Sequence, residues 1–177
     1  MTNYRRNIVS GATYFFTVNL ADRRRAVLID NIDALRAAFR ETRFRHPFAI
    51  DAIVVLPDHL HAIWTLPEGD GDFGMRWSLI KARFSRALPG GEAVSESRRR
   101  RRERGIWQRR YWEHTVRAEN DFVRHVDYIH FNPVKHGYVE NVADWQYSSF
   151  HRMVKMGFYP SDWAIRTSDT NGDFGER

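Results

Sequence analysis

The chain of 177 residues contains no cysteine. This absence excludes a disulfide framework and any zinc site ligated by cysteine. No apolar run approaches the roughly 20 residues that a membrane-spanning helix requires. The N-terminus, MTNYRRNIVSGATYFF, lacks the continuous apolar stretch and the small-residue cleavage site of a signal peptide. The sequence therefore indicates a soluble, cytoplasmic protein that does not bind membranes.

Apolar and aromatic residues are plentiful by contrast. Hydrophobic residues make up 42% of the chain, which includes 12 Phe, 7 Tyr and 6 Trp, and this is enough to build a packed core. The length fits one domain with modest extensions. We expect a single domain over residues 1–166, with a basic insertion at about 89–107. Residues 167–177 are expected to form a disordered tail.

Positive charge is concentrated in one stretch. The formal net charge is +6, and the segment from Arg98 to Arg110 contains eight Arg and one Glu, so that the rest of the chain is close to neutral. Such a block repels itself unless it is solvated or meets an anionic partner, and nucleic acid is the polyanion that the pattern favours. A solvated basic loop without a specific partner is the alternative.

Hydrophobic periodicity predicts seven main elements. Segments rich in aromatic and β-branched residues predict strands, and segments with apolar residues at helical spacing predict helices; several of them are bounded by proline or glycine signals. The expected strands are residues 13–20, 48–56, 59–66 and 111–117, and the expected helices are residues 32–45, 75–88 and 119–131. The order is typical of an α+β, ferredoxin-like antiparallel sheet with helices on one face. Many functions share this layout, so the fold alone decides nothing about function.

The triplet His59-Leu60-His61 is the first candidate for chemistry. Residues two apart in a strand point to the same face, so the two imidazoles project together and Leu60 faces the other side. Two adjacent imidazoles can bind a divalent metal ion through neutral nitrogens. Two unrelated histidines, one solvated and one in the core, are the alternative. Asp58 points to the opposite face in an ideal strand and is not expected to be a ligand.

Tyr128 and Asn132 form the second candidate. Their spacing of four places them one turn apart on one face of the last predicted helix. An amide oxygen can serve as a third ligand for a hard divalent ion, and a nearby tyrosine can attack a phosphodiester. Because Pro133 follows Asn132, we expect Asn132 to be the last helical residue or a cap. A core tyrosine with a helix-ending amide is the alternative, and we expect the neighbours His125 and His130 to have structural or DNA-facing roles.

The segments VVLPDHLHAIW and RYWEHTVRAENDFVRHVDYIHFNPVKHGYV together resemble the REP-associated tyrosine transposases, which are related to the single-tyrosine transposases of the HUH nuclease superfamily. The similarity covers about Tyr4 to Trp163, and WQYSSFH resembles the C-terminal region of that family. The triplet alone is a weak signal, but its combination with YIHFNPVKHG at this separation is specific. Two departures are Leu56 and Asp58, where many relatives have Met and Asn, and Lys135-His136, where Arg-Ala is commoner.

The resemblance implies the HUH nuclease fold and a role for each candidate residue. His59 and His61 match the metal-binding histidines, Tyr128 matches the nucleophile, and Asn132 falls where related enzymes complete the metal site. The metal is expected to be Mg²⁺ or Mn²⁺. The substrate is expected to be single-stranded DNA beside a palindromic hairpin, cleaved through a 5′-phosphotyrosine intermediate, by a monomer or a homodimer. The residues expected to contact DNA are Arg98, Arg99, Arg100, Arg101, Arg102, Arg104, Trp107, Arg109, Arg110 and Lys135.

Two other functions are compatible with these residues. A DNA-binding regulator that has lost catalysis would keep the basic block and the aromatic residues, but it would not need the complete set of His59, His61, Tyr128 and Asn132. A metal-dependent hydrolase of small phosphoesters would leave Tyr128 without a role. Formation of a covalent protein–DNA adduct distinguishes the transposase from both.

Overall fold

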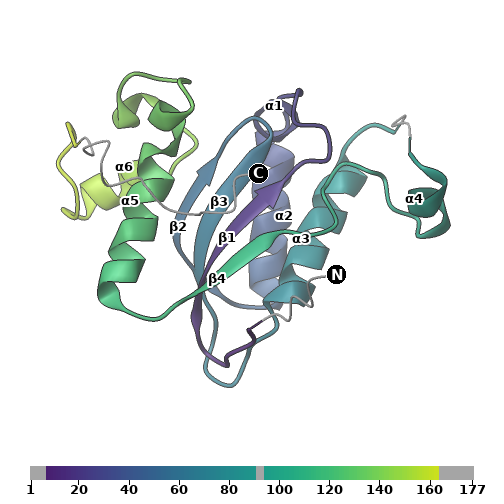
Figure 1. Cartoon of the computed structure of the whole chain (residues 1–177), viewed down its shortest axis with the longest axis horizontal. Helices are drawn as coiled ribbons and strands as arrows, with labels where there is room; N and C mark the ends of the chain where they lie inside the picture. Colours follow the sequence, from purple (N-terminus) through teal and green to yellow (C-terminus); the bar gives the residue numbers. More distant parts are fainter. Residues whose placement is uncertain (1–6, 91–93, 164–177) are drawn as a thin grey trace, which may run out of the picture.

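One antiparallel sheet organises the protein. The computed structural model describes residues 7–90 and 94–163. The strands are β1 (Thr13–Asn19), β2 (Ala49–Val55), β3 (His59–Thr65) and β4 (Trp112–Val116), and they lie in the order β2-β3-β1-β4 (Figure 1). The expected α+β class and antiparallel sheet are confirmed, and each expected strand lies within two residues of its predicted ends.

Helices cover both faces of this sheet. The helices are α1 (Val27–Asp30), α2 (Ile32–Arg45), α3 (Phe73–Ala87), α4 (Glu96–Arg100), α5 (Glu119–Lys135) and α6 (Phe150–Lys155), with a short 3-10 helix at Val142–Asp144. The pair α2 and α3 packs on one face, whereas α5 packs against β2 and β3 on the other (Figure 1). The expectation that the helices share one face therefore holds for α2 and α3 only. Within the described ranges, no helix is long and apolar enough to cross a membrane.

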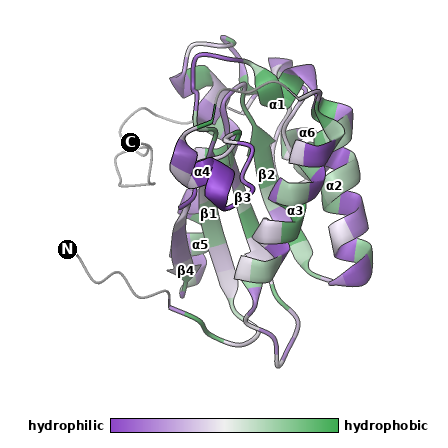
Figure 2. Ribbon diagram, turned by 90° about the vertical axis from the view of Figure 1, so that its right-hand side faces the viewer, coloured by the Kyte–Doolittle hydropathy of each residue, from purple (hydrophilic) through white to green (hydrophobic). Residues whose placement is uncertain are grey.

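The alternation of side chains along β1 and β3 explains this two-sided architecture. Even-numbered residues such as Phe16 and Trp64 enter the large core beneath α2 and α3. Odd-numbered residues such as Phe15 and Ile63 enter a second core beneath α5, because a strand with apolar residues at successive positions buries both of its faces. In Figure 2 most of β2 is coloured hydrophobic, whereas α4 is mostly hydrophilic.

Helix α5 is longer than the sequence indicates. It continues through Pro133 to Lys135, so the expected end at Asn132 is wrong. Proline removes only its own N–H donor and disfavours the helical conformation of the preceding residue without forbidding it. The last turn is held by a hydrogen bond from the His136 backbone N–H to the Asn132 carbonyl (3.0 Å), and Pro133 is buried.

The outer edge of β2 is covered by the segment that follows α5. The Val55 N–H donates to the Tyr147 carbonyl (2.9 Å), and the Ser149 N–H donates to the Ile53 carbonyl (2.8 Å). The Ser149 hydroxyl accepts a further hydrogen bond from the Ile53 N–H (2.9 Å) and contacts the His130 Nε2 atom (3.0 Å). Pairing of this kind hides an edge that would otherwise present free backbone groups to other chains.

The structure describes most of the expected basic insertion but not the expected C-terminal tail. Helix α4 lies within the expected insertion at 89–107, between α3 and β4, and it projects at one end of the molecule (Figure 1). The expected tail, residues 167–177, lies outside the described residues.

His130 makes the stability of the protein depend on pH. Burial of the ring, followed by the charges of Arg152 and His151, lowers the pKa of His130 to about 3. The unfolded chain gains a proton here near pH 6.5, the ordinary histidine value, whereas the folded chain does not until about pH 3. The free energy of unfolding should therefore fall as the pH is lowered from about 6.5 towards 3, by up to about 1.4 kcal/mol per pH unit from this group.

The variant His130→Gln tests this expectation, since glutamine does not titrate but can hydrogen-bond to Ser149. We expect a shallower decrease of the melting temperature between pH 7 and pH 4.5 than in the parent protein, measured by circular dichroism. The partly exposed His46→Gln serves as the control. Equal slopes for the parent and His130→Gln would contradict the assignment.

Candidate active site

The two histidines of the triplet lie together on the α5 face of the sheet. His59 and His61 are fully buried, and their ring centroids are 5.0 Å apart. They lie on β3, an inner strand, where they pair with Asn19 and Thr17 of β1. Leu60 points into the opposite core, as the strand alternation predicts. The site therefore sits at the end of the sheet where β1 ends and β3 begins.

An aspartate fixes the orientation of His59. The His59 Nδ1 atom lies 2.7 Å from one carboxylate oxygen of Asp58, and the Arg23 Nε atom donates to the other at 2.6 Å. Burial alone would raise the pKa of Asp58, but the hydrogen bonds from His59 and Arg23 lower it to about 2. An ionised carboxylate only accepts hydrogen bonds, so Nδ1 carries the proton. The other nitrogen, Nε2, is buried and has no hydrogen-bond partner among the described residues.

The second imidazole is held in the same way by a hydroxyl group. The His61 Nδ1 atom lies 2.9 Å from Thr17 Oγ1, its cross-strand neighbour. A metal-binding imidazole is usually oriented by a partner on its second nitrogen, which keeps the first nitrogen available as a ligand. Both histidines have such a partner, and the buried His59 Nε2 is a polar atom that a cation would satisfy. The donor set fits a divalent metal ion.

Tyr128 meets the histidine pair from α5. Its ring centroid lies 5.3 Å from that of His61 at an interplanar angle of 74°, and 6.1 Å from that of Phe15. Tyr128 is only 1% exposed, but its hydroxyl group is not enclosed by apolar atoms, because Lys135 Nζ donates a hydrogen bond to it at 3.2 Å. Lys135 is itself exposed, so a substrate would reach the phenol by displacing side chains such as this one.

The last turn of α5 brings two further residues to this end of the sheet. Asn132, one turn after Tyr128, is fully buried on the helix side that packs against the sheet. The ring of His136, the residue that caps α5, lies 5.2 Å from that of His59. Sequence reasoning recorded His136 only as a departure from the family pattern. The continuation of α5 past Pro133 carries this ring to the site, and that continuation was not expected.

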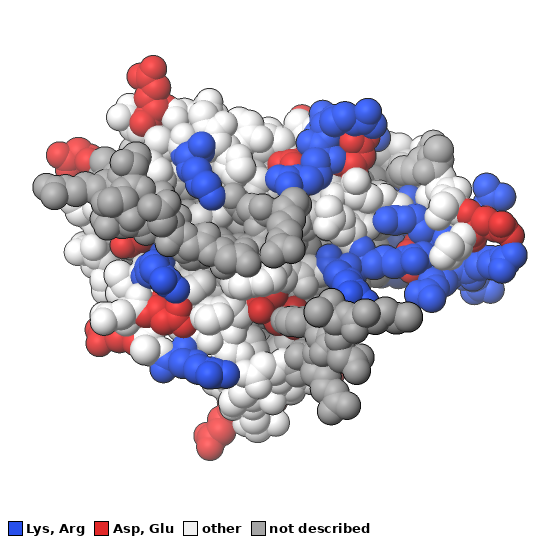
Figure 3. Space-filling model, in the orientation of Figure 1, with Lys and Arg blue, Asp and Glu red and all other residues white. Residues whose placement is uncertain are grey.

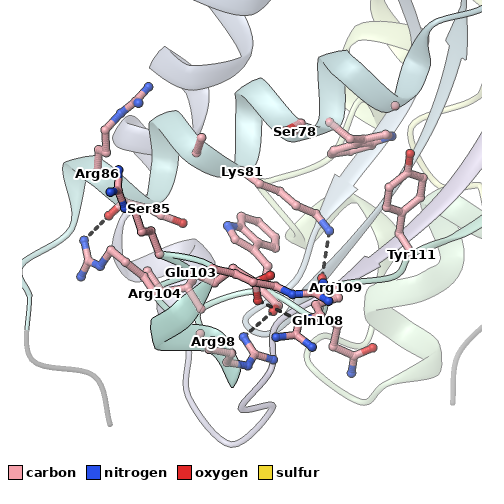
Figure 4. A pocket seen from close by; sticks show the side chains of 18 residues that line it. Ser78, Lys81, Ser85, Arg86, Arg98, Glu103, Arg104, Gln108, Arg109 and Tyr111 are labelled. Carbon is pink, nitrogen blue, oxygen red and sulfur yellow. Dashed lines mark hydrogen bonds and ion pairs between the residues drawn. The ribbon is translucent and has the colours of Figure 1, made fainter. Parts of the chain in front are cut away.

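The basic stretch divides into structural and exposed arginines. The Arg104 guanidinium donates to the carbonyls of Ser85, Leu88 (2.8 Å) and Pro89 at the end of α3, and Arg98 donates to the Trp107 carbonyl (3.2 Å) (Figure 4). These two side chains hold the loop in place. Arg109 pairs with Glu103 (2.8 Å) and Arg100 pairs with Glu96 on the surface of α4. Within this stretch, as far as the structure describes it, the exposed arginines that form no ion pair are Arg99, Arg101, Arg102 and Arg110.

Trp107 is also placed differently from the expectation. It is only 7% exposed and packs against Phe84, with ring centroids 5.4 Å apart, so its ring belongs to the core and does not face solvent. Together with Lys81 and the half-buried Tyr111, Trp107 lines a pocket of about 800 Å³ between α3 and the basic stretch (Figure 4). Lys and Arg side chains gather at this end of the molecule (Figure 3).

Sequence reasoning missed a cluster that connects β4 to α5. The His114 Nε2 atom lies 2.7 Å from an oxygen of Asp121, and His125 Nδ1 lies 2.8 Å from the Asp121 carbonyl and 3.1 Å from its carboxylate. Burial lowers the pKa of His125. The His125 ring packs on Phe15, which in turn contacts Tyr128. The ligand atoms could also hold a metal ion, but the three groups already bond to one another, so the cluster acts first as a connection that positions α5.

The structure has an antiparallel sheet whose inner strand β3 carries two adjacent histidines, and these face Tyr128 on helix α5. This arrangement agrees with the expectation from the sequence resemblance. No protein-family model matches the chain. A REP-associated tyrosine transposase of Escherichia coli is 47% identical over 177 residues, which cover all of this chain and 98% of the relative. A relative in Haemophilus influenzae, provisionally given the same name, is 49% identical over 165 residues, which cover 93% of this chain and 94% of the relative.

A solved structure of a REP-associated tyrosine transposase bound to a REP hairpin agrees with these relatives. It has a TM-score of 0.88 and 47% sequence identity, and the match covers all of this chain and 98% of that one. The chain therefore belongs to the REP-associated tyrosine transposases.

The contact between Asp58 and His59 provides a test of whether the two histidines bind a metal ion. We expect Asp58→Ala to weaken Mn²⁺ binding by about 10- to 100-fold in isothermal titration calorimetry, because the carboxylate orients the imidazole and increases its basicity. Asp58→Asn should lose less, since its amide oxygen still accepts from Nδ1. Asp22→Ala, which removes an exposed aspartate paired with Arg24, is the control. Unchanged Mn²⁺ affinity in Asp58→Ala would rule out this role.

Proposed function

We propose that the protein is a transposase that nicks and rejoins single-stranded DNA beside a hairpin, with Tyr128 as the nucleophile. The observation that supports this most directly is the contact between the rings of Tyr128 and His61 on the α5 face of the sheet. The family membership supports the reaction class, since the relative solved with a REP hairpin is similar over the whole chain.

The chemistry is an exchange of one phosphodiester for another. The Tyr128 hydroxyl oxygen forms a bond to phosphorus, and the bond between phosphorus and the 3′ oxygen breaks. The phenolic proton passes to solvent, and the departing 3′ oxygen takes up a proton to become a hydroxyl group. The products are a 5′-phosphotyrosine link and a free 3′-hydroxyl. Because the link conserves a phosphoester bond, attack by a second 3′-hydroxyl rejoins the strands without a nucleotide cofactor.

His59, His61 and Asn132 would hold a divalent metal ion, Mg²⁺ or Mn²⁺. When bound, such an ion supplies positive charge against the phosphate oxygens of the scissile bond. Asp58 and Thr17 keep the two imidazoles oriented, through contacts of 2.7 Å and 2.9 Å. The burial of His59 and His61 limits the access of water, which strengthens each electrostatic interaction in the site.

The exposed arginines would bind the DNA backbone at some distance from Tyr128. Residues 106–108, within the basic stretch, run beside the end of β1: the Ala21 N–H donates to the Ile106 carbonyl (2.8 Å), and the Gln108 N–H donates to the Asn19 carbonyl (3.0 Å). Asn19 pairs with His59, so the basic stretch is anchored beside the end of the sheet that carries the histidine pair. A duplex held by the arginines could extend a single strand towards this end of the sheet, while Lys81 and Tyr111 line the pocket beside the basic stretch.

The variant Tyr128→Phe tests the nucleophile. We expect it to form no covalent adduct with a hairpin-bearing single strand in the presence of Mn²⁺, measured by denaturing gel electrophoresis. Its affinity for the same strand should remain within a factor of about three of the parent, because only one hydroxyl is removed. Tyr138→Phe, at an exposed tyrosine after α5, is the control. Adduct formation by Tyr128→Phe would refute the assignment, and a parent protein that binds hairpins without any adduct would indicate a binding protein.

The division of the arginines predicts two different phenotypes. The triple variant Arg99→Ala/Arg101→Ala/Arg102→Ala should weaken hairpin binding and make the dependence of log K on log salt shallower by about 2 to 3, since each phosphate contact releases roughly 0.7–0.9 counterions. Arg104→Ala should instead lower the melting temperature, because it leaves carbonyls at the end of α3 without their donor.

Fluorescence anisotropy between 50 and 300 mM salt and a thermal melt distinguish the two phenotypes. The triple variant Arg36→Ala/Arg40→Ala/Arg45→Ala removes the same charge from the exposed side of α2 and should leave the salt dependence nearly unchanged. An equal loss of binding in the two triple variants would mean that only net charge matters.

A further inference from the structure

The side chain of Lys135 lies directly on the proposed nucleophile. Its Nζ atom donates a hydrogen bond to the Tyr128 hydroxyl at 3.2 Å and lies 4.7 Å from the centre of the tyrosine ring. The two residues are seven positions apart on α5, so the lysine extends from the exposed last turn back along the helix. This geometry is not that of a side chain extended into solvent to meet a DNA backbone.

We infer that Lys135 is a catalytic residue that stabilises negative charge on the Tyr128 oxygen during both nicking and joining. This inference rests on the proposed function of Tyr128. It differs from the expectation that Lys135 contacts DNA.

The chemistry of the exchange explains why a cation is useful at this place. In nicking, the phenolic oxygen must carry negative charge as it attacks phosphorus, and in joining the same oxygen leaves phosphorus as a phenolate. An ammonium group within hydrogen-bonding distance stabilises the oxygen in both directions, and its effect is greater where solvent is limited. Since an ammonium group has no lone pair, Lys135 does not remove the phenolic proton, which passes to solvent.

The other groups around the phenol do not duplicate this role. His61 of β3 contacts the tyrosine ring, but its Nδ1 atom is committed to Thr17 and its position matches a metal ligand. His136 follows Lys135 but packs on His59. Arg23 reaches the site from the loop after β1, but it is engaged by Asp58. Phe15, whose ring also contacts that of Tyr128, carries no charge.

The test separates a catalytic role from a DNA-binding role and from a structural one. In single-turnover assays with saturating hairpin DNA and Mn²⁺, Lys135→Met should slow both nicking and rejoining, each by about 100-fold, as removal of one charge-stabilising donor usually does. Lys135→Arg should recover most of both rates, because it restores the cation. The affinity for the hairpin, measured by anisotropy, should change by less than about threefold in both variants.

Several outcomes would overturn the inference. A DNA-contact role predicts a loss of affinity in Lys135→Met that saturating DNA overcomes, with an unchanged rate constant. A purely structural role predicts that Lys135→Arg and Lys135→Met lose activity equally or that both lower the melting temperature. Lys155→Met, at the exposed end of α6, is the matched control and should leave both rates unchanged.

Failure of this inference is distinguishable from failure of the proposed function. If Tyr128→Phe forms no adduct while Lys135→Met nicks and joins at parental rates, the nucleophile stands and the lysine has no catalytic role. If Tyr128→Phe still forms the adduct, Tyr128 is not the nucleophile, and both the proposed function and the proposed role of Lys135 are wrong.

Discussion

The packing of α5 against the inner strand β3 is the constraint on which the site depends. The helix presents Tyr128 and Asn132 towards the face that carries His59 and His61, and a sheet–helix interface fixes their separation more firmly than a loop would. Apolar neighbours such as Ile129 and Val126 fill the same interface. The core beneath α5 therefore does two things at once: it contributes to stability and it brings groups from two distant parts of the sequence together.

Much of this arrangement can be predicted from the sequence because it depends on local periodicity. The spacing of two between His59 and His61 places both imidazoles on one face of the strand. The spacing of four between Tyr128 and Asn132 places both side chains on one face of the helix. The position of α5 on the opposite face from α2 and α3 could not be obtained in this way. Strands buried on both faces read as continuous apolar runs, so β1 and β3 give no indication of which helix covers which side.

The remaining differences come from contacts that connect residues far apart in sequence or override a local preference. Asp58 was set aside because an ideal strand points it away from His59, yet it lies at the strand end, where its carboxylate can reach the Nδ1 atom. Trp107 and Arg104 belong to a basic stretch whose composition suggests solvent exposure. In the structure, however, their side chains attach this stretch to α3, because Arg104 donates to the Leu88 carbonyl and Trp107 packs on Phe84. Composition identifies a charged stretch, whereas only coordinates show which of its side chains are already engaged.

The covering of β2 by residues 147–149 has a consequence for how the protein is built. The segment that covers β2 comes after α5 in the sequence, while the strand that it protects is the second of the chain. A fragment that ended at α5 would retain every residue of the proposed site but would leave β2 open to pairing with other chains. The residues of the proposed site thus do not constitute a minimal module that can be separated from the rest of the chain, because the segment around WQYSSFH covers the edge of β2.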